Sequence, residues 1–150
     1  MSNSALLVGF FVSLGAVVVT LVVAIAFAKK KRIPAHVKAV GALLVCLVAT
    51  LGFAEALGQR YTFEATSHDI HMPIAFVTAL GLGLPLVTGM LTWKGKVSPK
   101  AHKVAVAFWL LCVVAAVVTG LWMLSEATPK EQARLTPALS LEPLEARARA

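Results

Sequence analysis

Apolar residues fall into four blocks of nearly equal length, separated by short polar segments. The blocks cover residues 5–28, 35–57, 71–93 and 101–124. A bilayer core about 30 Å thick is crossed by about 20 helical residues, so each block is long enough to span it with a small tilt. No alternating pattern of a membrane strand is visible, and the backbone in lipid must satisfy its own hydrogen bonds. The pattern therefore predicts four transmembrane helices.

Short connectors favour antiparallel packing of consecutive helices. The expected fold is an all-α membrane protein, an up-down-up-down four-helix transmembrane bundle over residues 1–124. In such a bundle the second and fourth helices lie diagonally opposite each other. Residues 125–150, which include Pro129, Pro137 and Pro143, are expected to form an extracytoplasmic tail.

Composition agrees with the membrane class: 59% of the residues are hydrophobic and 14% are charged, whereas a soluble domain carries about 25% charged residues. A formal net charge of +7 could indicate nucleic-acid binding, but the distribution of the charges along the chain indicates a different origin. Nine basic residues and no acidic ones lie around the first and third connectors: Lys29, Lys30, Lys31, Arg32, Lys38, Lys94, Lys96, Lys100 and Lys103. The rest of the chain has five basic and all seven acidic residues.

By the positive-inside rule this asymmetry places the first and third connectors in the cytoplasm and both termini outside. The net charge is then a topological signal rather than a nucleic-acid footprint. Cys46 and Cys112 lie inside apolar blocks, which argues against a disulfide scaffold or a zinc ribbon.

Three of the four histidines lie at the starts of predicted helices: His36, His71 and His102. The second and fourth helices also repeat each other at an offset of 66 residues, with Ala35-His36 matching Ala101-His102, and a proline precedes each pair. His36 and His102 are therefore expected at similar depth on diagonal helices. Two imidazoles facing each other across a bundle can ligate a haem iron from both sides, and Lys38, Lys100 and Lys103 lie within reach of its propionates.

Two glycines support a cofactor in the bundle. Gly89 follows His71 by 18 residues, and Gly120 follows His102 by the same interval. Eighteen residues make five helical turns, so each glycine shares the azimuth of its histidine at the other membrane face. Gly89 is thus expected at the depth of His36 and His102, where it leaves room for a porphyrin, and Gly120 at the depth of His71.

A second candidate site lies at the outer end, where His68 and His71 are three residues apart and Met72 follows. Histidines at this spacing present two nitrogens on one helical face, a pattern that suits copper. Alternatively, His71 ligates a second haem, although its diagonal partner helix has no histidine. The competing interpretation is that all these histidines are interfacial or structural, and Trp109 is interpreted as core packing rather than cofactor lining.

Three runs of residues carry a resemblance to a known family: His102-x6-Trp109-x9-Thr119-Gly120, His71-x13-Pro85-Leu86, and the basic connector leading into His36. Over residues 29–124 the chain resembles a small family of four-helix bacterial membrane proteins, formerly of unknown function, that is linked to assembly of haem-copper cytochrome c oxidase. The resemblance implies that His36, His71 and His102 are the family's landmark histidines, and that the chain lies in a bacterial inner (cytoplasmic) membrane. The layout is also similar to four-helix b-type cytochromes.

The first functional hypothesis is a haem-binding respiratory-chain protein that transfers electrons or accompanies an oxidase, with haem b held by His36 and His102. The second is a non-catalytic assembly factor for haem-copper oxidase, and the third a structural subunit of a membrane complex. We find no phosphate-binding loop, no zinc-protease motif and no nucleophile with a base, so independent catalysis is not expected. The expected partners are the lipid bilayer and respiratory or oxidase subunits.

Overall fold

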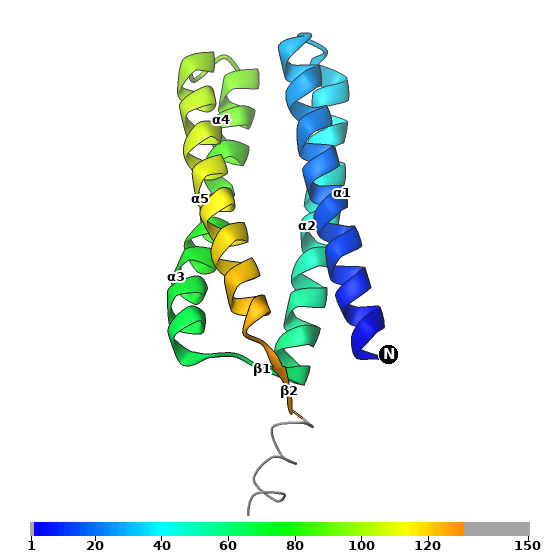
Figure 1. The fold of residues 1–150 in the computed structure, drawn as a ribbon. Coiled ribbons are helices and arrows are strands. Elements are labelled where there is room, and N and C mark those ends of the chain that lie inside the picture. Colours follow the sequence, from blue (N-terminus) through cyan, green and yellow to red (C-terminus); the bar gives the residue numbers. More distant parts are fainter. Residues whose placement is uncertain (1, 131–150) are drawn as a thin grey trace, which may run out of the picture. The chain divides into compact units, whose positions relative to one another are not determined.

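The computed structural model describes residues 2–130 and consists almost entirely of helices (Figure 1). The helices are α1 (Asn3–Lys29), α2 (Ile33–Arg60), α3 (Ala65–Gly81), α4 (Gly83–Trp93) and α5 (Pro99–Ser125). Two short strands, β1 (Tyr61–Thr62) and β2 (Thr128–Pro129), pair with each other. Residues 131–150, most of the predicted tail, lie outside the described residues.

Four helical segments in the described part of the chain are long and apolar enough to cross a membrane. They are Asn3–Lys29, Ile33–Arg60, Ala65–Trp93, which combines α3 and α4, and Pro99–Ser125. The prediction of four membrane-spanning helices is confirmed in this respect, and the chain is a multi-pass membrane protein by the length and composition of its helices. Large apolar side chains such as Val45, Leu80 and Leu111 are about 70% exposed, as expected of surfaces that face lipid.

Local sequence explains where two of the helices begin. The Ser2 hydroxyl accepts a hydrogen bond from the Ala5 N–H, and the Ser98 hydroxyl accepts one from the Ala101 N–H. A serine in this position satisfies one of the backbone donors that the first helical turn leaves without a partner. Pro99 then occupies the first turn of α5, where a missing N–H costs nothing.

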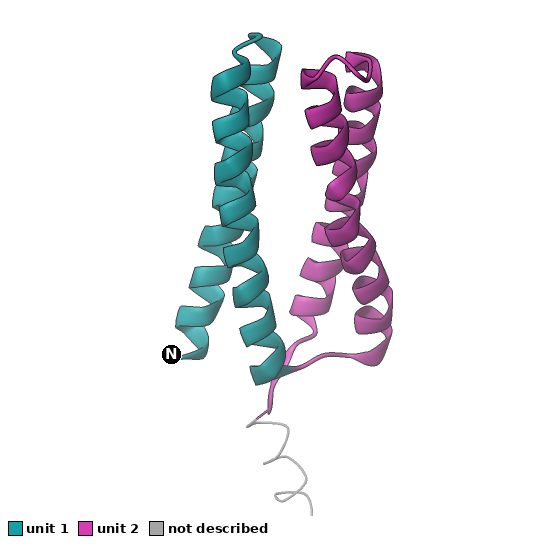
Figure 2. Ribbon diagram, turned by 180° about the vertical axis from the view of Figure 1, so that it is seen from behind, with its two compact units in different colours: residues 1–61 teal, residues 62–150 magenta. Residues whose placement is uncertain are grey.

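The structure comprises two compact units, Met1–Tyr61 and Thr62–Ala150 (Figure 2). In unit 1, α1 and α2 pack as an antiparallel hairpin. His36 near the start of α2 contacts Ala24 near the end of α1, and Phe53 lies over Gly9 near the opposite ends. A Cβ atom at Gly9 would lie 2.5 Å from the Phe53 ring, so this close approach requires glycine.

Unit 2 is a second antiparallel hairpin, in which α3 and α4 pack against α5. The residue numbers of its contacting polar pairs add up to 190: residues 71 and 119, 78 and 112, and 88 and 102. The same register continues into the paired strands, where the Thr62 and Thr128 hydroxyls lie 2.7 Å apart. A constant sum means that α3 and α4 run past α5 in one uninterrupted antiparallel register.

The third span differs from the expected single helix because it is broken near its middle, between Gly81 and Gly83. Pro85 has no N–H, so the helix cannot supply a donor to the carbonyl four residues earlier. The Leu82 N–H bonds to the Leu80 carbonyl rather than to Thr78. The Thr78 carbonyl instead accepts a hydrogen bond from the indole of Trp109, at 3.0 Å, across the hairpin.

Candidate functional site

The three predicted histidines lie near helix starts, with one difference in position. His36 is in the first turn of α2 and His102 is in the first turn of α5. His71 does not open its helix, because α3 begins six residues earlier, at Ala65. His68, which was expected to precede the helix, therefore also lies on α3.

His36 is oriented by a backbone carbonyl of the neighbouring helix. Its Nδ1 lies 2.8 Å from the carbonyl oxygen of Ala24, which is itself buried. A carbonyl can only accept, so Nδ1 carries the hydrogen and donates it. In the neutral ring the lone pair is then on Nε2, the atom that can bind a metal.

His102 has the same tautomer as His36, but its hydrogen-bond acceptor is a hydroxyl group. Its Nδ1 lies 3.2 Å from Thr88 Oγ1, and Thr88 donates its own hydrogen to the Leu84 carbonyl at 2.8 Å. A threonine hydroxyl has one hydrogen, so Thr88 accepts from the imidazole. The neutral His102 ring therefore also has its hydrogen on Nδ1 and its lone pair on Nε2.

His71 has the same arrangement at the other end of the hairpin. Its Nδ1 lies 3.0 Å from Thr119 Oγ1, and Thr119 donates to the Ala115 carbonyl at 2.9 Å. By the same argument His71 holds its hydrogen on Nδ1. The three histidines thus share one tautomer, fixed by acceptors on a different helix in each case.

The two glycines singled out from the sequence lie directly against these rings. A Cβ atom on Gly89 would lie 3.1 Å from Cε1 of His102, and one on Gly120 would lie 3.0 Å from Cε1 of His71. The space that each glycine leaves is filled by an imidazole of the partner helix. Whether the glycines also admit a porphyrin stays a prediction.

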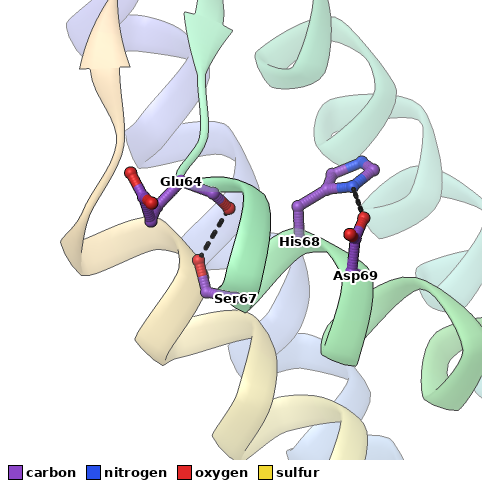
Figure 3. Close-up of polar contacts among 4 residues, drawn as sticks. All are labelled: Glu64, Ser67, His68 and Asp69. Atoms are coloured by element: carbon purple, nitrogen blue, oxygen red, sulfur yellow. Dashed lines mark hydrogen bonds and ion pairs between the residues drawn. The ribbon is translucent and has the colours of Figure 1, made fainter.

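The outer candidate residues are more loosely held. His68 is 46% exposed, and its Nδ1 lies 3.4 Å from a carboxylate oxygen of Asp69 (Figure 3). The fully buried Ser67 donates to the Glu64 carbonyl in the first turn of the helix. Met72 is 48% exposed. Copper binding by His68 and His71 remains a prediction.

Among residues 2–130, no group of three or more His, Cys, Asp or Glu side chains is placed to hold a metal ion. His71 and His102 belong to unit 2, at opposite ends of its hairpin, whereas His36 belongs to unit 1. The pairing of His36 with His102 across one cofactor therefore stays a prediction. Trp109, interpreted as a packing residue, is 5% exposed and also bonds to Thr78.

Sequence reasoning missed the residues that orient the imidazoles, namely Ala24, Thr88 and Thr119. For the two threonines a signal was present, because a threonine immediately precedes each of the two glycines. No sequence signal marks Ala24, whose contribution is a carbonyl group.

Comparisons with protein-family models, with curated proteins and with solved structures give no match to this chain.

Proposed function

We propose that the chain is a haem-binding membrane protein of the respiratory chain, in which His36 and His102 are the axial ligands of one b-type haem. It either transfers electrons or is an oxidase-associated subunit. The observation that carries the proposal is the shared tautomer: Nδ1 of each ring donates to a fixed acceptor, which leaves the lone pair on Nε2. Metal-bound histidines are oriented in this way, by a hydrogen bond from the nitrogen that does not bind the metal.

Haem suits a site with few protein donors. The porphyrin supplies four of the iron's ligands, so one imidazole from each of two helices completes the coordination. When bound, the haem supplies one-electron chemistry; the protein's part is to hold both rings and to exclude water. The apolar side chains of α2 and α5 would exclude water from the haem.

The basic connectors favour a haem at this end of the helices. Lys38 lies two residues after His36, and Lys100 and Lys103 flank His102. Cationic side chains beside a haem edge stabilise its propionates in a partly desolvated interface. With the connectors on the cytoplasmic side of a bacterial membrane, the haem would lie near that side.

The test is the reduced-minus-oxidised visible spectrum of the full-length protein purified from a host supplied with a haem precursor. Sharp bands of a bis-imidazole haem are expected in the wild type and in His68→Ala, which serves as the matched control. The bands should be lost in His36→Ala and in His102→Ala, while circular dichroism shows retained helix. A colourless wild-type protein, or bands that survive both substitutions, would contradict the proposal.

A further inference from the structure

Unit 2 contains an inverted repeat that was not evident from the apolar pattern. The motif His-x16-Thr-Gly occurs twice, as His71 to Gly89 and as His102 to Gly120, at an offset of 31 residues. In the antiparallel register of the hairpin, the histidine of each copy meets the Thr-Gly pair of the other. The hairpin thus has approximate two-fold symmetry about an axis near its middle.

The two ends of the hairpin agree in detail. The Nδ1 to Oγ1 distances are 3.0 Å at His71 and 3.2 Å at His102. The threonine hydroxyls donate to the carbonyl four residues earlier at 2.9 and 2.8 Å. Each ring lies on a glycine at nearly the same separation. Ring orientation, tautomer and local space are therefore equivalent at both ends.

We infer that His71 is the axial ligand of a second haem, bound at the opposite end of the hairpin from His102. This inference rests on the proposed function, because it assigns to His71 the role that the equivalent His102 has there. The depth difference is given by the 18 residues between His102 and Gly120, about 27 Å at 1.5 Å per residue. The two irons then lie toward opposite faces of the membrane.

The second iron differs from the first in its coordination. The chain has four histidines, of which His36 and His102 are assigned to the first haem. His68 precedes His71 by less than one turn of α3, so both side chains approach from the same helix. A planar macrocycle needs axial ligands on opposite faces, and His68 cannot reach the far one. The second haem therefore has one imidazole and no second histidine, and we expect its other axial position to be open.

The experiment measures the haem-to-protein ratio by the pyridine haemochrome method and the difference spectrum on adding carbon monoxide to the reduced protein. We expect two haems in the wild type and one in His71→Ala, which keeps the bis-imidazole bands. Carbon monoxide should bind to the wild type and not to His71→Ala. In His68→Ala, the matched control, both haems and the carbon monoxide response should remain.

A second variant keeps His71, so that the test does not depend on whether His71→Ala folds. Thr119→Val removes the hydroxyl that orients the ring, and we expect it to weaken retention of the second haem 10–100-fold while leaving the first in place. Thr119→Ser should behave like the wild type.

The outcomes separate the two proposals. One haem in the wild type, lost in His102→Ala and unaffected by His71→Ala, would overturn the second site and leave the proposed function intact. Two haems with no response to carbon monoxide would overturn the open position. A wild-type protein without haem would overturn both proposals.

Discussion

Two threonine hydroxyls determine which nitrogen of each unit 2 histidine carries the hydrogen in the neutral ring. Thr88 and Thr119 each pass their single hydrogen to a carbonyl of their own helix and accept from an imidazole of the other helix. Threonine within a helix commonly bonds to the carbonyl of the preceding turn. Here that local bond has a consequence across the hairpin, because it converts the hydroxyl into an acceptor.

Replacing Thr88 by valine tests this role for His102. The shape of the side chain is nearly kept, but the acceptor is lost, so the ring is free to change tautomer and rotate. We expect haem affinity to fall 10–100-fold in titrations of the apoprotein, as is typical when the orienting partner of a metal-bound histidine is removed. Thr88→Ser should restore it.

Thr20→Val is the matched control, because the Thr20 hydroxyl makes the same local bond, to a carbonyl of the preceding turn of α1. Equal affinity in Thr88→Val and Thr20→Val would show that the hydroxyl does not orient His102.

Gly89 limits the space available to the His102 ring. A leucine there would displace the imidazole, whose Cε1 would lie 3.1 Å from the new Cβ. We expect Gly89→Leu to remove the bis-imidazole haem bands. Gly15→Leu on α1, where an added Cβ would have open space, should leave the spectrum unchanged. A wild-type spectrum in Gly89→Leu would show that the His102 ring can bind haem without the space that Gly89 leaves.

At the level of elements, the break between α3 and α4 is stabilised from α5. The Trp109 indole supplies the donor that the Thr78 carbonyl lacks within its own helix. An unsatisfied carbonyl at membrane depth is costly, because lipid offers no partner. The tryptophan therefore packs the core and also completes the backbone hydrogen bonding of the neighbouring span.

Trp109→Phe keeps most of the packing and removes the N–H. Hydrogen bonds between membrane helices contribute about 0.6 kcal/mol on average and up to about 1.7 kcal/mol, and we expect a loss of stability in the upper part of that range. Unfolding in mixed micelles, followed by circular dichroism, measures it. The Trp122 N–H bonds to Glu126 at the exposed end of α5, so Trp122→Phe should cause a smaller loss of stability.

Pro85→Ala tests whether the proline is the cause of the break. An alanine N–H can bond to Gly81, and a continuous helix would offer the Leu82 N–H to Thr78. The cost of Trp109→Phe should then be smaller in the Pro85→Ala background than in the wild type, which a double-mutant cycle measures. Equal costs in both backgrounds would show that the two residues act independently.

The spans were predictable because a block of more than twenty mostly apolar residues has few alternatives to a membrane helix. The break was not, because Gly81-Leu82-Gly83 leaves the apolar run unbroken, although Pro85 nearby was a signal of disturbed hydrogen bonding. The start of α3 was missed for the opposite reason. Residues 66–69 are polar, and the first turn of this helix contains a local hydrogen bond from Ser67 that hydropathy does not reveal.

At the level of the whole molecule, charge gives an expected orientation that labelling can test. In a variant lacking Cys46 and Cys112, a single cysteine at position 2 should react with an impermeant maleimide added outside intact cells. Cysteines at positions 31 and 96, in the two basic connectors, should react only after the membrane is opened. Labelling of position 96 from outside would reverse the sidedness assigned to His71 and His102.

The identity of the candidate residues could be predicted from the sequence, but the tautomers of the histidines could not. The positions of His36 and His102 in the first turns of their helices and the 18-residue intervals to the glycines follow from the sequence. His71, in contrast, was expected to open its helix and lies six residues after the start of α3. The tautomers depend on which atoms of another helix lie opposite each ring, and that requires the hairpin register. The contact of His36 with the Ala24 carbonyl has no side-chain signature at all.

The two-fold symmetry of unit 2 has a consequence for how this hairpin enters the bilayer. Turned end over end, it would present the same histidine, threonine and glycine contacts at the same depths, so these contacts do not distinguish one insertion from the other. The choice is left to residues outside the membrane, above all the lysines of the connector between α4 and α5. Orientation is thus encoded mainly by the connector, and the paired histidine, threonine and glycine contacts by the helices.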